Sequence, residues 1–400
     1  MTTTEIQHLI DEAFAKDSDD IVTVDLPAGT HELDAPLRLK PHVHLRGVGD
    51  QTVLKTRNKD INFIELDPGD DTAAHDIRIS KLHLIGPSDD PDITHDVASK
   101  PELGCGILAA TKGDSNAVEQ VVRDIVIEGC RIENVSGCGI RFDTRQDVLM
   151  KDITVKNCQL LQNRRPPDTG SPDSYKDIYF YGTRFENIHL EGNTCSFTPN
   201  ASSPYGNDSG IAFVINRLKR SGCFVRNSRM IGNTCSGHRR HGIVTNYSSM
   251  AAFDVEVRGN TCRDNRWAGI YVNTDIEEGE NLTIEDNVCE HNGYGGSSDP
   301  THGDHSIRGG IVLTGCYNSQ INNNHCANNG RPSSGFGGAD ASAKNAAGIR
   351  VRGKNLTLKG NKTENNVGGS IAKWPTPYEN VTIISDKDGK GGCLAALWPF

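Results

Sequence analysis

The sequence predicts an all-β protein: a single-domain right-handed parallel β-helix, or solenoid, with an N-terminal capping helix. Three observations carry this prediction. A phrase built around Asn-x-Cys recurs along the chain, a second phrase that begins with Gly-Ile alternates with it, and helical periodicity is confined to the N-terminus. Repeats of this kind form stacked coils, each of which contacts only its neighbours.

The N-terminal segment, residues 1–56, is predicted to contain the cap and the first coils. Ile6, Ile10 and Phe14 fall on one face of a short amphipathic helix, which can cover the open end of a coil stack. Short apolar stretches separated by Gly, Pro and Asp follow, and they indicate the first strands.

The cysteines mark one repeated position of the coil. The clear and weaker copies are Cys130, Cys158, Cys195, Cys235, Cys262, Cys289 and Cys326, with Thr363 in the equivalent place after them. Stacked parallel strands lie about 4.8 Å apart, so this column is predicted to be buried packing rather than disulfides or metal ligands. The asparagines two residues earlier are predicted to form a side-chain ladder: Asn193, Asn233, Asn260, Asn287, Asn324 and Asn361.

The Gly-Ile phrases have the alternation and β-branched content of short strands. They begin at positions 106, 139, 210, 242, 269, 310 and 348. Two or more strands in each coil of roughly 27 residues describe a β-helix, and parallel crossover connections are almost always right-handed. The helix body is therefore predicted over residues 57–385, followed by a C-terminal tail or cap over 386–400.

The N-terminal segment carries a further pattern, a strand with Leu-Pro-Ala-Gly-Thr followed by Leu-x-Gly-x-Gly-x-x-Thr-x-Leu. The residues are Leu26, Pro27, Ala28, Gly29, Thr30, His31, Leu45, Arg46, Gly47, Gly49, Thr52 and Leu54. This segment resembles the entry to the pectate-lyase-like β-helix superfamily. The resemblance implies the β-helix fold, while members include polysaccharide lyases, glycoside hydrolases, uronate epimerases and phage tailspikes.

Composition excludes some functions and leaves the compartment open. The chain has 42 Lys and Arg against 52 Asp and Glu, a net charge of −10, and no long basic stripe, so nucleic acid is not expected as a partner. No apolar run reaches the roughly 18 residues that span a bilayer, so no membrane partner is expected. The N-terminus shows no secretion signal, which fits a cytoplasmic protein or a mature secreted form.

Long insertions all fall at one place in the coil, between the Cys position and the next Gly-Ile strand. They are 159–178, 196–209, 290–309 and 327–347. Insertions at one coil position rise from one face, which is often the binding face. Two coils with short connections lie between them, and we predict a groove floor there that is rich in His and Arg and attracts an anionic substrate.

Candidate site residues follow from this floor and from the strands beside it. The catalytic candidates are His238, Arg240, His241, Arg266, Tyr271, Asp208, Asp264 and Asp275. The substrate-binding candidates are Arg239, Asn246, Arg263, Trp267, Asn273, His305, Arg308 and Arg350.

Three classes of function are compatible with these residues. A uronate lyase or epimerase removes the proton α to a carboxylate, with His238 or His241 as base, Arg240 or Arg266 on the carboxylate and Tyr271 as acid. A glycoside hydrolase or transferase would use paired carboxylates among the aspartates. A non-catalytic carbohydrate-binding or tailspike-like body is the third class. We favour the lyase or epimerase.

The expected partner is a poly- or oligosaccharide, acidic in the favoured class, bound by a monomer or homotrimer. No metal ligands are assigned and no cofactor is indicated. Calcium stays open, because the resemblance is to a superfamily whose lyases often hold calcium with acidic residues.

Overall fold

The computed structural model describes most of the chain. The residues outside the described part are 17–19, 68–72, 88–101, 111–120, 145–147, 164–174, 199–206, 216–222, 246–250, 275–278, 296–306, 334–338, 340, 374–378 and 385–400. The chain divides into two compact units. Unit 1 comprises Met1–Phe197 with Gly206–Asp208, and unit 2 comprises Thr198–Tyr205 with Ser209–Phe400. The predicted tail, 386–400, lies outside the described residues, as do the central parts of the four predicted insertions.

The predicted N-terminal helix is confirmed as α1, Thr3–Phe14. It begins with a capping box, in which the Thr2 hydroxyl accepts a hydrogen bond from the Glu5 backbone amide and the Glu5 carboxylate accepts one from the Thr2 amide. Ile6 and Ile10 are fully buried, and Phe14 is half-buried beneath the Lys40 ammonium. Among the described residues, no helix is long and apolar enough to cross a membrane.

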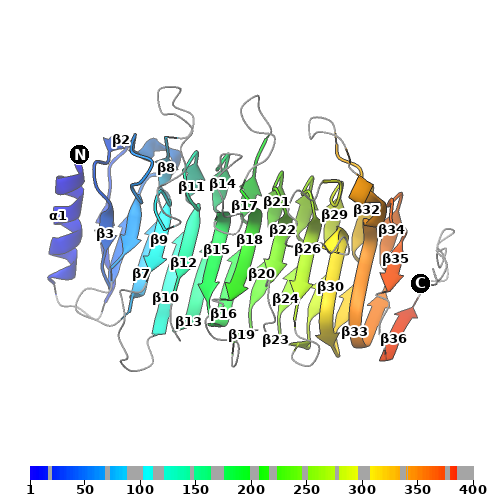
Figure 1. Ribbon diagram of the computed structural model, residues 1–400. Helices are drawn as coiled ribbons and strands as arrows, with labels where there is room; N and C mark the ends of the chain where they lie inside the picture. The colour runs from blue at the N-terminus through cyan, green and yellow to red at the C-terminus, as the bar shows by residue number, and fades with distance from the viewer. Residues whose placement is uncertain are drawn as a thin grey trace. The chain divides into compact units, whose positions relative to one another are not determined.

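Unit 1 winds parallel strands into two sheets (Figure 1). The first sheet contains β1 (Val22–Asp25), β3 (Leu37–Leu39), β4 (Val43–Arg46), β6 (Ile64–Leu66), β7 (His75–Ser80), β9 (Ile107–Ala110), β10 (Val121–Glu128), β12 (Ile140–Asp143), β13 (Leu149–Lys156), β15 (Lys176–Gly182) and β16 (Arg184–Glu191). The second contains β2 (Gly29–Glu32), β5 (Thr52–Lys55), β8 (His83–Ile85), β11 (Arg131–Glu133), β14 (Gln159–Leu161) and β17 (Thr194–Ser196). A 3-10 turn, Gly49–Gln51, precedes β5.

Unit 2 repeats the arrangement. Its first sheet contains β18 (Ser209–Ile215), β19 (Phe224–Arg226), β20 (Arg229–Ile231), β22 (His241–Thr245), β23 (Ala251–Phe253), β24 (Glu256–Arg258), β26 (Ala268–Asn273), β27 (Gly279–Glu280), β28 (Thr283–Glu285), β30 (Gly309–Tyr317), β31 (Gln320–Asn322), β33 (Ala347–Lys359), β35 (Ile371–Lys373) and β36 (Glu379–Ile384). Its second contains β21 (Thr234–Ser236), β25 (Thr261–Arg263), β29 (Val288–Glu290), β32 (His325–Ala327) and β34 (Lys362–Glu364). A 3-10 turn, Ala341–Asn345, precedes β33.

The superfamily pattern in the N-terminal segment has a direct structural cause. The Thr52 hydroxyl donates to the Pro27 carbonyl at 3.1 Å and accepts from the Val48 amide at 2.9 Å, so it joins two turns of successive coils. Gly47 lies between them where a Cβ atom would approach the Lys81 carbonyl oxygen to 2.3 Å. A side chain at Gly47 would therefore push the coils apart.

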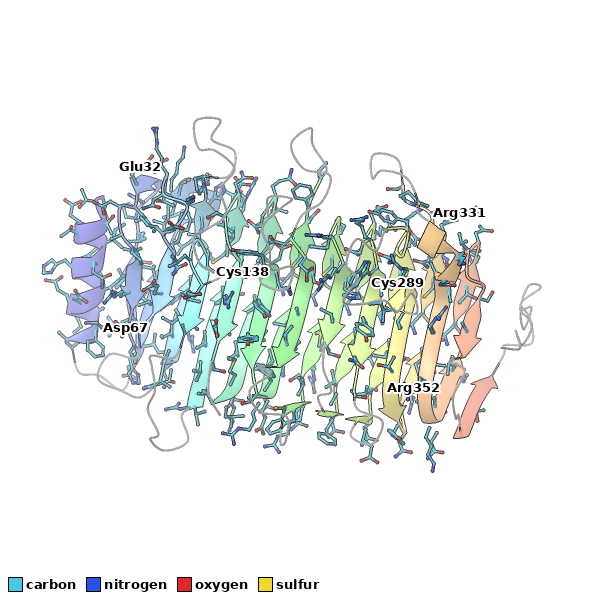
Figure 2. All side chains as sticks on the ribbon, viewed as in Figure 1. Glu32, Asp67, Cys138, Cys289, Arg331 and Arg352 are labelled. Carbon is cyan, nitrogen blue, oxygen red and sulfur yellow. The ribbon has the colours of Figure 1, made fainter. Side chains whose placement is uncertain are left out.

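The cysteine column is confirmed as buried packing. In unit 2, Cys235, Cys262, Cys289 and Cys326 pair in register on successive second-sheet strands, and all four are fully buried (Figure 2 labels Cys289). The cysteines of the described chain are free thiols. The repeated glycine fits against this column, because a Cβ atom at Gly269 would lie 3.0 Å from the Cys289 sulfur. The two repeated phrases are thus complementary halves of one packing layer.

The predicted asparagine ladder is also confirmed. The Asn260 Oδ1 accepts from the Asn233 backbone and side-chain amides at 2.9 and 3.0 Å. Its Nδ2 donates to the Met230 carbonyl at 2.8 Å and to the Asn287 Oδ1 at 3.0 Å. The same bonds repeat at the next coils, so each buried side chain satisfies the backbone of the coil before it.

A second ladder lies three residues after the Cys position, and the sequence analysis missed it. Asn265, Asn292 and Asn329 form the same hydrogen bonds from coil to coil. At the end of this ladder, the Asn265 Oδ1 accepts a hydrogen bond from the His238 backbone amide. Its sequence signal was available, since Cys-x-x-Asn recurs in the same coils. This ladder has a direct consequence for the candidate site.

Replacing Asn260 by Ala is expected to destabilise the fold by about 3 kcal/mol, because it leaves a buried amide of the neighbouring coil without its acceptor. The exposed Arg258, whose ion pairs lie at the surface, is the control: Arg258→Ala should change the unfolding free energy by less than about 1 kcal/mol. Urea unfolding measures both. Equal losses in the two variants would contradict the ladder's role.

The buried thiols are expected to resist alkylation in the folded protein. All eleven described cysteines are buried, so the reagent cannot reach their sulfur atoms in the folded chain. Burial also raises the pKa of Cys316 to about 12, whereas the pKa of Cys262 is lowered, against the effect of burial, by hydrogen bonds with Cys235 and Cys289. Exclusion of the reagent, rather than a shortage of thiolate, is therefore the basis of the prediction. Iodoacetamide labelling with peptide mapping should leave the eleven described cysteines unmodified until denaturant is added. Rapid labelling of the column in the native protein would show that the column is open.

Candidate functional site

The strongest cluster in unit 2 surrounds Trp267. Arg240, Trp267 and Arg308 each immediately precede a first-sheet strand, β22, β26 and β30, so they hold the same coil position. The Arg240 guanidinium lies 4.7 Å from the Trp267 ring centroid and that of Arg308 lies 5.9 Å from it. These are cation–π distances, and they concentrate two positive charges at one indole.

A second pair adjoins this cluster. The His241 ring stacks on the Tyr271 ring with centroids 5.0 Å apart and an angle of 24°, and it meets the Trp267 ring edge-on at 5.4 Å. The Ala268 amide donates to the His241 Nδ1 at 3.3 Å, which fixes the ring's orientation. An imidazole and a phenol, both able to transfer protons, therefore lie beside two guanidinium groups. We call Arg240, His241, Trp267, Tyr271 and Arg308 the Trp267 cluster.

The cluster is buried, where an accessible groove floor is predicted from the sequence. The exposed fraction is 0% for His241, 2% for Arg240, 3% for Arg308, 5% for Trp267 and 7% for Tyr271. Alternation along a strand separates two faces, but it does not reveal whether a face is covered. The chemistry therefore lies in a largely enclosed environment, where electrostatic interactions are stronger than in water.

His238, a predicted catalytic base, stands at the end of the second asparagine ladder. It is fully buried, as His241 is, so its partners rather than its burial distinguish the two. Its Nδ1 lies 2.8 Å from the Asn265 Oδ1, and its backbone amide donates to the same oxygen at 3.2 Å. The physical reason is that the ladder needs a donor side chain at this position, and an imidazole supplies it as an amide would.

The other basic candidates differ in exposure and in the groups that they contact. Arg263 is on β25 of the second sheet, exposed and paired with Glu290 at 3.0 Å, whereas Trp267 immediately precedes a first-sheet strand. Arg239 and Arg266 are half-buried. Arg266 is closely covered by the chain at Gly295, where a Cβ atom would lie 2.2 Å from its Nε.

Two further candidates lie on first-sheet strands near the cluster. Arg350, on β33, shares a column with Val312 and, one coil earlier, Tyr271. Its Nη2 donates to the Asn345 carbonyl at 2.8 Å. The Asn273 Oδ1 accepts from the Thr314 hydroxyl at 2.6 Å. Arg350 therefore extends the column of the Trp267 cluster by two coils.

The aspartate candidates are engaged in structural contacts or are not described. Asp264 is buried, and its Oδ1 accepts from the Ser333 amide at 3.0 Å. Asp208 belongs to unit 1, where its carboxylate lies 2.9 Å from the Lys176 ammonium with both side chains fully buried. Asp275 lies outside the described residues, as do Asn246 and His305.

Unit 1 contains a buried charged cluster whose centre, Lys176 and Tyr179, the sequence analysis missed. The Tyr179 ring lies 5.1 Å from both the Arg141 guanidinium and the Lys176 ammonium. Burial raises the pKa of Tyr179 well above its ordinary value, although the Arg141 charge opposes this. Arg141 also pairs with Asp143 at 2.6 Å. The signal was weak, because Lys176 and Tyr179 lie at the end of an insertion rather than in a repeated phrase.

Comparison with known proteins assigns the architecture. A family model described as a right-handed beta helix region matches residues 122–298. The chain is a right-handed parallel β-helix. A second model, described as periplasmic copper-binding protein (NosD), matches residues 224–383 of this β-helix. Comparison with curated protein sequences finds no match.

Solved structures share the fold at low sequence identity. The A-module of the Azotobacter vinelandii mannuronan C-5 epimerase AlgE6 is similar with a TM-score of 0.54, 16% identity and coverage of 96% of this β-helix and 95% of that chain. PfbA, a surface adhesin of Streptococcus pneumoniae, gives a TM-score of 0.53 at 11% identity, with 93% of each chain covered. The catalytic domain of an α-1,3-glucanase gives 0.51 at 14%, covering 94% of this chain and 66% of that chain.

The described residues of the β-helix do not fit a copper ion in the segment that matches the NosD model. Within the described part of 224–383, no three His, Cys, Asp or Glu ligand atoms lie within 4.8 Å of one another. The buried thiols there stack one per coil as a packing column. This segment therefore matches the NosD model, but its described residues do not form a set of copper ligands.

The ladder role of His238 predicts a selective tolerance. His238→Asn should keep the unfolding free energy within about 1 kcal/mol, because an amide continues the Asn265 ladder, whereas His238→Ala should lose about 2 kcal/mol through an unsatisfied buried group. Thermal and urea unfolding distinguish the two. If Asn destabilised as much as Ala, position 238 would need the imidazole itself.

Proposed function

We propose that the protein is a carbohydrate-active enzyme that abstracts the C5 proton of a uronate unit, as a polysaccharide lyase or a C5-epimerase. The observation that carries the proposal is the Trp267 cluster, in which two guanidinium groups and a stacked His241–Tyr271 pair lie together in a largely buried place. Its chemistry matches the two requirements of this reaction, charge neutralisation and proton transfer.

The charge requirement comes first. A proton α to a carboxylate becomes acidic only when the negative charge that develops on the carboxylate is stabilised. Arg240 and Arg308 can donate paired hydrogen bonds to a planar carboxylate, a geometry that Lys cannot reproduce. Trp267, whose backbone amide donates to the Arg240 carbonyl at 2.8 Å, holds the two guanidinium groups against its ring. We assign these three residues to binding and neutralisation.

The proton requirement falls to His241 and Tyr271. Either group transfers protons near neutral pH when suitably placed, and their stacking holds them at a fixed separation. In a lyase, one group removes the C5 proton, the C5–H electrons form the C4=C5 double bond, and the other group protonates the glycosidic oxygen, which leaves C4 with the electrons of the C4–O bond. In an epimerase, a proton returns to C5 from the opposite face, and because the two rings stack on each other this proton would come from a donor outside the pair.

The fold adds support of a general kind. The mannuronan C-5 epimerase A-module has the same fold over nearly its whole length, so a β-helix of this size can carry such chemistry. The α-1,3-glucanase and the adhesin share the fold as well, so hydrolysis and binding without catalysis are the alternatives that the experiment must separate.

The first test incubates the purified protein with polymannuronate, polyguluronate and polygalacturonate in deuterated water. Ultraviolet absorbance of unsaturated ends identifies a lyase, and deuterium at C5 without cleavage identifies an epimerase. Either result supports the proposal. New reducing ends without unsaturation would replace it by hydrolysis, and binding without any turnover would replace it by a carbohydrate-binding role.

The variants then assign the residues. His241→Gln and Tyr271→Phe should each lower kcat by at least about 100-fold, the usual contribution of a positioned acid or base. Arg240→Lys should lower kcat/KM by about 100-fold through loss of the paired hydrogen bonds. His238→Asn and Arg263→Ala are matched controls from the ladder and the second sheet. Loss of activity in the controls, with retention in His241→Gln, would reject the assignment.

A further inference from the structure

We propose that His42, His75 and Asp76 in unit 1 bind a divalent transition-metal ion such as Zn²⁺. One ligand atom from each residue lies within 4.8 Å of the other two. The described chain contains no other group of three or more His, Cys, Asp or Glu residues with this property. The inference concerns a site in unit 1 that the proposed uronate chemistry of unit 2 does not use.

The three residues meet where two successive coils stack. His42 precedes β4, and His75 and Asp76 open β7, the parallel partner of β4 (Figure 1 labels β7). The His42 backbone amide donates to the Asp76 carbonyl at 3.0 Å, which fixes the two residues side by side. An ion held here would connect two coils through His42 and Asp76, which are 34 positions apart in the sequence.

The side chains converge on one point. The His75 Nδ1 lies 2.8 Å from the Asp76 Oδ2, and the two imidazole centroids are 5.4 Å apart at an angle of 81°. Ligand atoms around tetrahedral zinc lie about 3.3 Å apart, since each Zn–N or Zn–O bond is close to 2.0 Å. The three ligand atoms, all within 4.8 Å of one another, would have to adjust to this spacing when an ion binds.

His42 supplies the observation that points to a ligand. Its Nδ1 is buried and has no hydrogen-bond partner in the described part of the structure. A buried polar atom without a partner is costly and calls for an explanation. A metal ion that accepts the Nδ1 lone pair would provide one. His75 and Asp76 keep 15% and 29% of their side chains exposed, which gives an ion a route from solvent.

The backbone holds the ligands before any ion arrives. His42 and Asp76 have φ angles of 57° and 50°, in the left-handed region, which residues other than Gly adopt uncommonly and in which Asn, Asp and His are enriched. The equivalent turn in following coils holds Asp124 and Asp152, with φ of 54° in each. His42 is therefore the exception among the residues that stack at this turn, and its ring contacts the ring of His75.

Arg123 would compete with a metal ion for the Asp76 carboxylate. Its Nη1 lies 3.2 Å from the Asp76 Oδ2 and 2.5 Å from the Asp124 Oδ2. Without an ion, the guanidinium and the His75 ring share the Asp76 carboxylate. When an ion binds, Arg123 can keep its bond to Asp124 and release Asp76. Two imidazoles and one carboxylate select Zn²⁺ or a similar ion over Mg²⁺ and Ca²⁺, which prefer all-oxygen sites.

Isothermal titration of the metal-free full chain with zinc chloride tests the site. We expect one Zn²⁺ per chain at micromolar or tighter affinity, no comparable binding of Mg²⁺, and a rise in the thermal midpoint on loading. His42→Ala and Asp76→Asn should each weaken the affinity at least tenfold. Cobalt substitution should give the visible absorption of a tetrahedral site in the wild type and lose it in both variants.

His44→Ala is the matched control, because His44 lies two residues after His42, on β4, and its Nε2 contacts the Ser80 hydroxyl instead. It should bind zinc as the wild type does. Arg123→Gln should tighten binding several-fold by removing the competing cation. His42→Gln serves if His42→Ala misfolds. The inference is overturned if the wild type takes up no zinc, if folded His42 and Asp76 variants bind as tightly as the wild type, or if Arg123→Gln weakens binding.

Discussion

The stacking of one coil on the next through buried asparagine side chains is the interaction on which the rest of the molecule depends. Parallel strands alone satisfy the backbone within the sheets, but the turns between strands leave amides and carbonyls inside the coil. The ladders through Asn260 and Asn265 bind these groups with three hydrogen bonds at each step. Since a buried unsatisfied amide costs about 1–3 kcal/mol, the ladder fixes which residue of each coil lies above which. This register determines which residues of successive coils are neighbours, including those of the candidate sites.

Charge is concentrated at one place in the coil in each unit. In unit 1, Lys176 opens β15 and pairs with Asp208, and in unit 2, Arg240 and Arg308 immediately precede β22 and β30. Lys176 and Arg308 lie at the ends of long insertions, whereas Arg240 follows a short connection. A buried ion pair such as Lys176–Asp208 seldom gains stability over apolar packing.

The turn that carries His42 and Asp76 illustrates a different use of the repeat. Left-handed turns recur at the same places in successive coils, and most hold Asn or Asp, whose short side chains tolerate that conformation. Because the turns stack, any ligand-bearing side chain placed in one coil approaches the residue in the next. A solenoid thereby converts distant sequence positions into a compact set of donors without a dedicated loop.

The sequence by itself determined the architecture. The alternation of the Gly-Ile and Asn-x-Cys phrases predicted the strands, the buried thiol column and the first ladder, because each of these depends on local pattern and on the fixed rise between coils. The amphipathic spacing of Ile6 and Ile10 likewise predicted α1. It also identified Arg240, Trp267 and Arg308 as site candidates, because their shared position in the coil can be read from the repeat.

Tertiary structure decided what those residues face. His238 and His241 are three positions apart and equally basic in the sequence, yet one completes a ladder and the other stacks on Tyr271. Arg263 looks like Arg240 in the sequence but lies on the other sheet, paired with Glu290. The meeting of His42 with Asp76 required the fold as well, because it depends on which turns stack. Periodicity specifies a residue's place in the coil, whereas burial and partners depend on what covers that place.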